Sequence, residues 1–119
     1  MSSESGDLKT LKETVRRFVA ERGWDRFHSP KNISMALIVE AAELVEHFQW
    51  LTEKESAELS SETRGKVELE MADILIYLIR LADKLDVDLV EAAEKKIEDN
   101  KRKYPVEKVR GNSKKYSDY

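Results

Sequence analysis

The fold is decided by the stretch Val67-Glu-Leu-Glu-Met-Ala-Asp-Ile-Leu-Ile-Tyr-Leu-Ile-Arg-Leu-Ala-Asp-Lys-Leu85, the most apolar part of the chain. Its apolar residues recur every three or four positions rather than every second position, which is typical of an α-helix. One stripe along this helix consists of Val67, Met71, Ile74, Leu78, Leu81, Ala82 and Leu85. A second apolar side consists of Leu69, Ile76 and Ile79. A helix that is apolar on two sides must bury both, so we expect a second subunit to cover the second side.

The segments on either side of this stretch show the same helical spacing. Including the stretch itself, the expected helices span about 7–22, 29–50, 61–85 and 88–103, with a short turn at 52–55. Glycine or residues with short polar side chains mark their ends: Gly23, Ser29 or Asn32, Thr52, Ser60 or Ser61, and Asp88. The segments Thr52-Glu-Lys-Glu55 and Asp88-Leu-Val-Glu91 have the form of capping boxes. The last helix is expected to stop before Pro105, because proline disfavours a helical conformation in the residue before it.

Length and composition indicate one helical domain. A chain of 119 residues fits a single domain, and 40% apolar residues are enough to form a core without disulfides or a zinc site. We therefore predict an all-α domain over residues 1–119. It is expected to be a four-helix bundle over about 7–104, followed by an extended tail over 105–119.

Charge and cysteine content exclude several classes of protein. The net charge of −3 does not favour a polynucleotide-binding protein, which relies on a positive field. The lack of cysteine excludes disulfides, thiolate zinc sites and a cysteine nucleophile. The first residues lack the features of a secretory signal, and the longest apolar run is far shorter than the roughly 20 residues of a membrane span. We expect a soluble, cytoplasmic protein that binds neither polynucleotides nor membranes.

Two pairs of acids border the apolar faces of neighbouring helices. In the second expected helix, Glu40 falls inside the apolar face and Glu43 lies at its edge. In the third, Glu70 and Asp73 lie side by side at the edge of the apolar stripe, with Tyr77 one turn further on. The short connection between these helices makes them antiparallel neighbours, which can bring the four carboxylates face to face.

A cluster of four carboxylates in a partly desolvated place needs a cation, because otherwise it would take up protons or push the helices apart. Oxygen ligands without cysteine favour Mg²⁺, with Mn²⁺ or Ca²⁺ next, and disfavour zinc and copper. Magnesium commonly binds phosphate oxygens, so such a site is open to a phosphate-bearing ligand. A carboxylate that is not fully used as a ligand could accept a proton from water, and Glu43 at the edge is the candidate.

A second interpretation needs no metal. Most charged residues on helices belong to solvated faces, and these acids could share such faces with Lys66, Arg80 and Lys84. The chain would then be a non-catalytic helical module that binds protein partners through its apolar third helix. The acid pairs alone do not decide between the two interpretations, and His47 is given no role.

The order Glu40-Ala-Ala-Glu43 followed by Glu70-Met-Ala-Asp73 resembles the metal signature of the MazG-like superfamily of all-α nucleoside triphosphate pyrophosphohydrolases. Further segments resemble its dCTP pyrophosphatase branch and extend the resemblance from about Leu8 to Tyr116. These segments are Ala20-Glu-Arg-Gly-Trp-Asp-Arg-Phe-His28, Phe48-Gln-Trp50, Asp73-Ile-Leu-Ile-Tyr77, Asn100-Lys-Arg-Lys-Tyr-Pro105, Arg110-Gly111 and Lys115-Tyr116.

The resemblance implies hydrolysis of a nucleoside triphosphate, with dCTP or a modified dCTP as the expected substrate, to the monophosphate and pyrophosphate. This reaction would cleanse the nucleotide pool. The magnesium ligands that it implies are Glu40, Glu43, Glu70 and Asp73. The nucleotide-binding residues that it implies are Trp24, Asp25, Arg26, Phe27, His28, Trp50 and Tyr77. It also suggests a homodimer or homotetramer whose site is completed by Trp50 of a neighbour. Val15 stands where animal members, as we align them, carry a histidine at the base site.

Two further expectations concern the bound nucleotide. Lys96, Asn100 and Lys103 share one face of the last helix and offer hydrogen-bond donors to phosphate, with Tyr104 beside them, although a solvated face is the simpler explanation of the lysines. Tyr77 is expected to stack against the deoxyribose, although a place in the core is its alternative role.

Overall fold

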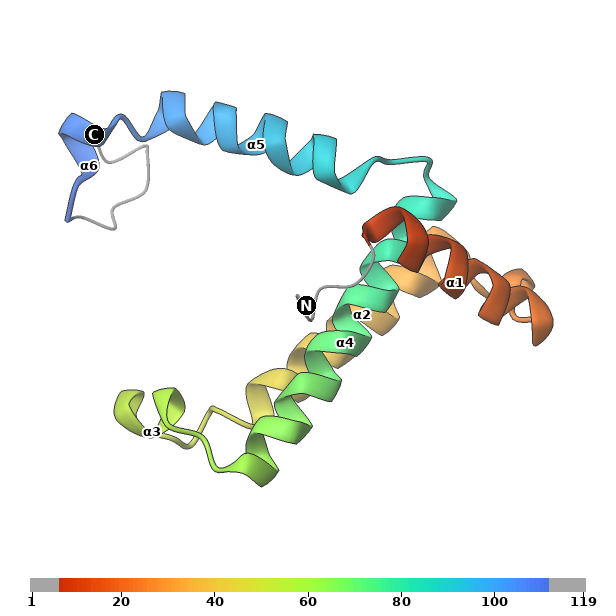
Figure 1. Ribbon diagram of the computed structural model, residues 1–119, viewed down its shortest axis with the longest axis horizontal. Helices are drawn as coiled ribbons and strands as arrows, with labels where there is room; N and C mark the ends of the chain where they lie inside the picture. The colour runs from red at the N-terminus through yellow and green to blue at the C-terminus, as the bar shows by residue number, and fades with distance from the viewer. Residues whose placement is uncertain (1–6, 112–119) are drawn as a thin grey trace. The chain divides into compact units, whose positions relative to one another are not determined.

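The computed structural model describes residues 7–111 and contains helices but no strand in that range (Figure 1). This confirms the predicted all-α class. The elements are α1 (Leu8–Glu21), the 3₁₀ helix η1 (Asp25–Phe27), α2 (Pro30–Glu46), α3 (Glu53–Ala57), α4 (Ser61–Lys84), α5 (Leu89–Lys103) and α6 (Val106–Val109). None of the helices in the described part of the chain is both long and apolar enough to cross a membrane.

The predicted helix ends are confirmed where a side chain caps them. The Ser29 hydroxyl accepts a hydrogen bond from the Asn32 backbone N–H, with Pro30 at the first helical position of α2. At α3 both hydrogen bonds of the capping box between Thr52 and Glu55 are present. Gly23, with φ of +64°, follows α1 in the left-handed conformation that glycine adopts without strain.

One predicted helix end was wrong, and part of the predicted tail is helical. The helix expected to reach Trp50 ends at Glu46, where the backbone N–H groups of His47 and Phe48 bond to carbonyls three residues back, at 3.2 and 2.9 Å. The expected extended tail contains the short helix α6, which begins directly after Pro105. The predicted tail residues 112–119, including Lys115 and Tyr116, lie outside the described part of the chain.

The chain packs as two compact units, the first up to Asp86 and the second from Val87. The first contains α1, α2, α3 and α4, and the second contains α5 and α6. The long helices of the expected four-helix bundle are therefore divided between two units. The bundle and the single domain stay predictions.

The core of the first unit forms where α4 packs along α2 and against α1 (Figure 1). Its buried apolar side chains are Val15, Val19, Ile33, Val67, Ile79 and Ala82. Ile33 and Ile79 are only 2% exposed, and removing such a side chain from water is worth about 1.5–3 kcal/mol. This core fixes the register of α2 against α4 and so positions the acidic side chains on both helices.

The prediction of two apolar sides on α4 is corrected at Ile79. We expected another subunit to cover this residue, but it is buried within the chain, in the unit where α1 and α2 pack against α4. Leu69 remains 69% exposed on the same predicted side, whereas Met71, from the predicted core stripe, is 57% exposed. The helical pattern identified the apolar positions but not which of them α1 and α2 cover.

Candidate metal centre

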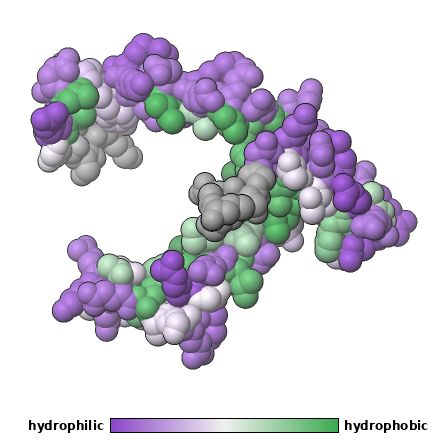
Figure 2. All heavy atoms as spheres, viewed as in Figure 1, coloured by the Kyte–Doolittle hydropathy of each residue, from purple (hydrophilic) through white to green (hydrophobic). Residues whose placement is uncertain are grey.

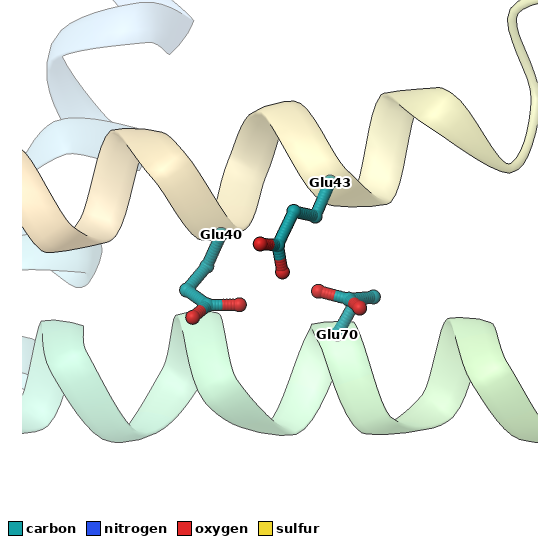
Figure 3. A group of neighbouring side chains, drawn as sticks. All are labelled: Glu40, Glu43 and Glu70. Carbon is teal, nitrogen blue, oxygen red and sulfur yellow. The ribbon is translucent and has the colours of Figure 1, made fainter.

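Three carboxylates converge between α2 and α4 (Figure 3). Glu40 and Glu43 come from α2 at a spacing of three residues, which places them on neighbouring turns of one face. Glu70 comes from α4 and points toward both of them. One carboxylate oxygen of each residue lies within 4.8 Å of the others, and all three side chains are half-buried.

Burial and mutual repulsion make this cluster unfavourable when it is empty and fully ionised. The pKa of Glu40 is raised from its ordinary value of 4.5 to about 7, first by burial and next by the hydrogen bond and charge of Glu43. The charge of Asp73 and a hydrogen bond with Glu70 add to this shift. Glu40 and Glu70 each also carry one buried oxygen, Oε2, without a hydrogen-bond partner. Such oxygens need a proton or a cation.

The donor set fits a hard divalent cation. The three ligand atoms are carboxylate oxygens, which magnesium, manganese and calcium prefer and which do not favour zinc or copper. The two unpartnered oxygens are the atoms that such an ion would satisfy. The structure therefore provides a candidate divalent-metal centre, and the predicted acid pairs are brought together as expected for three of the four residues.

Asp73, the fourth predicted ligand, lies outside this three-residue group and is exposed. Its charge nevertheless contributes to the raised pKa of Glu40, so it lies close enough to act on the cluster. Its role as a ligand stays a prediction.

A histidine that the sequence left without a role borders the cluster. Nε2 of His47 lies 3.8 Å from Oε1 of Glu70. The sequence signal was present, since Glu40, Glu43 and His47 follow one another at helical spacings of three and four.

The predicted nucleotide-binding segment 24–28 is fixed to its surroundings at several points. The rings of Trp24 and Phe18 pack edge to face with centroids 5.6 Å apart. The Asp25 carboxylate binds Arg80 and also Lys84, which is 3.2 Å away. Phe27 is 56% exposed, with the Arg26 guanidinium 4.7 Å from its ring centroid.

Of these side chains, Asp25 is engaged by Arg80 and Lys84 within the chain, whereas the ring of Phe27 is exposed enough to contact a ligand. The other predicted contact residues of this unit differ in exposure: Trp50 is 85% exposed, and Tyr77 is half-buried on α4.

Arg80 is a residue beside the predicted nucleotide-binding segment that the sequence did not single out. The sequence placed it only on the solvated face of the alternative interpretation, but it is only 5% exposed. A signal was available, because Arg80 continues the row Glu70, Asp73 and Tyr77 along α4 at helical spacing.

The predicted phosphate-binding residues Lys96, Asn100, Lys103 and Tyr104 belong to the second unit, on and just after α5. Lys96 and Lys103 both pair with Asp99, at 3.7 and 3.2 Å. The hydrogen bond and charge of Lys103 lower the pKa of Asp99. This acid, which the prediction did not consider, offsets part of the positive charge of the row.

Comparisons with known proteins point to one group. A model of the MazG-like family matches residues 35–119. The protein dCTP pyrophosphatase 1 of Bos taurus is 40% identical over 118 residues, which cover 98% of this chain and 70% of that protein. The Homo sapiens protein of the same name is 39% identical over 113 residues, covering 93% and 66%. A pyrophosphatase from Archaeoglobus fulgidus DSM 4304, known from its crystal structure, is 39% identical with a TM-score of 0.79, covering 88% of this chain and 98% of that one.

The raised pKa of Glu40 predicts how pH and metal affect stability. Because its folded pKa of about 7 exceeds its ordinary value of 4.5, Glu40 stabilises the metal-free fold fully below pH 4.5, and this contribution is lost as pH rises through 7. Saturating Mg²⁺ at pH 8 should replace the proton and raise the Tm by about 5 °C or more.

Thermal unfolding of chelator-treated protein at pH 5 and pH 8, with and without Mg²⁺, measures both effects. Glu40→Gln should flatten the pH dependence and remove most of the Mg²⁺ response. The control is Glu46→Gln, which changes an exposed acid on the same helix and should behave as wild type. Equal Mg²⁺ responses in the two variants would contradict a metal centre at Glu40.

Proposed function

Since this chain belongs to the MazG-like family, we propose that it is a nucleoside triphosphate pyrophosphohydrolase. It converts a nucleoside triphosphate to the monophosphate and pyrophosphate. The observation that carries this function is the three-carboxylate cluster with two buried, unpartnered oxygens, because an enzyme acting on phosphates through a divalent cation needs such a site. The relatives named dCTP pyrophosphatase support dCTP or a modified dCTP as the substrate. A cytoplasmic location stays a prediction from the sequence.

The proposed cation is Mg²⁺, for which Mn²⁺ can substitute. Glu40, Glu43 and Glu70 would hold it, with Asp73 at the margin of the cluster. When bound, such an ion neutralises charge on phosphate oxygens and lowers the pKa of a coordinated water.

Glu43 is the proposed proton acceptor. Of the three clustered acids, Glu40 and Glu70 have a buried oxygen that lacks a partner, whereas Glu43 has none and lies nearer the edge of the face. A carboxylate at the edge can meet the attacking water and accept its proton, while the two more enclosed acids are better suited to hold the cation.

The row along α4 suggests how the nucleotide lies. Arg80 is ten residues beyond Glu70, which corresponds to about 15 Å along a helix. The acids lie at one end of this row, and the 24–28 segment contacts Arg80 at the other. Phosphates at the acidic end would leave the base near Phe27 and His28 and the sugar near Tyr77, between the two ends. Roles for Trp50 at the base and for the α5 row at phosphate stay predictions.

The exposed apolar surface supports assembly with further copies of this chain. Figure 2 shows apolar side chains at the surface of the face on which α4 lies. Helix α2 also carries exposed apolar side chains: Met35, Ile38, Val39 and Val45, each more than half exposed. A surface of this kind in a water-soluble enzyme is normally covered by a partner, and we propose a homodimer or homotetramer.

Pyrophosphate release tests the reaction. Wild-type protein incubated with Mg²⁺ and a panel of nucleoside triphosphates should release pyrophosphate, with dCTP or a modified dCTP preferred. Glu43→Gln should lower kcat by about a hundredfold or more, the usual effect of losing a general base. The control Glu46→Gln should keep wild-type kcat. Release of inorganic phosphate alone would contradict the proposed reaction, and release of no product from any triphosphate would favour the non-catalytic interaction module.

Size measurements test the assembly. The wild-type protein should behave as a dimer or tetramer in light scattering at micromolar concentration. Ile38→Glu places a charge on the exposed face of α2 and should shift the protein to a smaller species, because desolvating an unpaired carboxylate is unfavourable. Lys31→Glu, an exposed polar position on the same helix, should leave the mass unchanged. A monomeric wild type would contradict the proposed assembly.

Sugar discrimination tests Tyr77. If its ring packs against the deoxyribose and excludes a 2′-hydroxyl, Tyr77→Ala should narrow the ratio of kcat/KM for dCTP to that for CTP. Leu81→Ala, one turn further along α4, is the control for a packing defect and should lower stability without changing the ratio. An unchanged ratio in folded Tyr77→Ala would remove this role.

A further inference from the structure

The charged guanidinium of Arg80 lies inside the protein and contacts three residues, two of them from the segment 24–28 and one from α4 itself. Its side chain is 6% exposed. Nε donates a hydrogen bond to Nδ1 of His28 at 3.2 Å, Nη1 donates to Asp83 at 3.4 Å, and Nη2 donates to Asp25. One rigid guanidinium therefore links α4 to Asp25 and His28 of the predicted nucleotide-binding segment 24–28.

Arg80 shares Asp83 with a second arginine. Asp83, one turn along α4, also accepts two hydrogen bonds from Arg16 of α1, at 3.0 and 2.5 Å. Lys84 adds a second cation to Asp25 at 3.2 Å. A buried ion pair is often no more stabilising than well-packed apolar residues, so stability alone does not account for this arrangement.

The contact with Arg80 decides where the proton of His28 resides. A guanidinium can only donate hydrogen bonds, so Nδ1 of His28 must accept and carry no proton. A neutral imidazole then carries its proton on Nε2. Burial lowers the pKa of His28, and the charges of Arg80 and Lys84 lower it further against the opposing effect of Asp25. His28 is thus kept neutral, with one tautomer favoured.

We propose that Arg80 is a positioning residue that fixes His28 as a neutral Nε2–H donor to a hydrogen-bond acceptor on the base of the nucleotide. This inference rests on the proposed function. No residue in the described part of the chain bonds to Nε2 of His28, and the exposed ring of Phe27 lies next to it in the sequence. Carbonyl oxygens and unprotonated ring nitrogens of a base fit such a donor, whereas an exocyclic amino group does not.

Nitrogen NMR of the histidine rings in the whole protein tests the first part without nucleotide. The two histidines, His28 and His47, can be told apart with His47→Gln. At pH 7, wild-type His28 should show an unprotonated Nδ1 and a protonated Nε2. A protonated Nδ1, a mixture of tautomers or an imidazolium would overturn the proposal, and this measurement needs no variant of Arg80 to fold.

Arg80→Met and Arg16→Met separate positioning from packing. Both remove an ion pair with Asp83, but only Arg80 touches His28. Arg80→Met should let His28 populate both tautomers, raise its pKa and raise KM for dCTP about tenfold, with a smaller change in kcat. Arg16→Met should lower the Tm and leave the His28 spectrum and KM unchanged. If Arg80→Met does not fold, Arg80→Lys keeps the positive charge but loses the planar fork and should show the same loss of tautomer.

The results that would overturn the positioning role of Arg80 differ from those that would overturn the proposed function. A wild-type His28 spectrum retained in Arg80→Met, or an unchanged KM once the tautomer is lost, would overturn the positioning role even if the enzyme releases pyrophosphate. Failure of wild-type protein to release pyrophosphate from any triphosphate would instead remove the proposed function, and with it the base as the partner of His28.

Discussion

The repulsion among three carboxylates between α2 and α4 is the constraint on which the rest of this structure depends. At 4.8 Å or less, each pair of ionised carboxylates repels by about 3 kcal/mol at the effective dielectric of a protein. The fold holds the helices together against this repulsion through apolar burial elsewhere, with Ile33 and Ile79 almost fully enclosed. Without a cation, the cluster can respond only by taking up a proton, and burial together with this repulsion raises the pKa of Glu40.

The buried charge of Arg80, on the same helix, is compensated in a different way from the charge of the carboxylate cluster. Arg80 is more deeply buried than any of the clustered acids, yet Asp25, Asp83 and His28 satisfy it within the chain. The acid cluster leaves two oxygens without partners, whereas the Arg80 centre is assembled from partners that the fold supplies. On the proposed function, this contrast separates a site that receives an ion from a site that holds the segment 24–28 in place.

Much of this arrangement could be predicted from the sequence, because it depends on local spacing. Caps such as Ser29 fix the helix starts, and the spacing of Glu40 and Glu43 places both acids on one face. Burial could not be predicted equally well. A helical pattern gives the angle of Ile79 but not the neighbour that covers it, and Arg80 has partners more than fifty residues away in the chain. Long-range contacts, rather than periodicity, decide these positions.

On the proposed function, the two ends of the row from Glu70 to Arg80 on α4 differ in charge, and this difference couples the metal to the substrate. Glu70 and Asp73 present negative charge at one end, and a triphosphate cannot approach it until a cation has offset that charge. At the other end His28 stays neutral, so it contributes orientation rather than attraction. The free energy of nucleotide binding then arises mainly at the metal, beside the carboxylates. The choice of base arises at the other end of the row, at His28. By linkage, a nucleotide that needs the metal to bind must tighten the binding of the metal by the same factor.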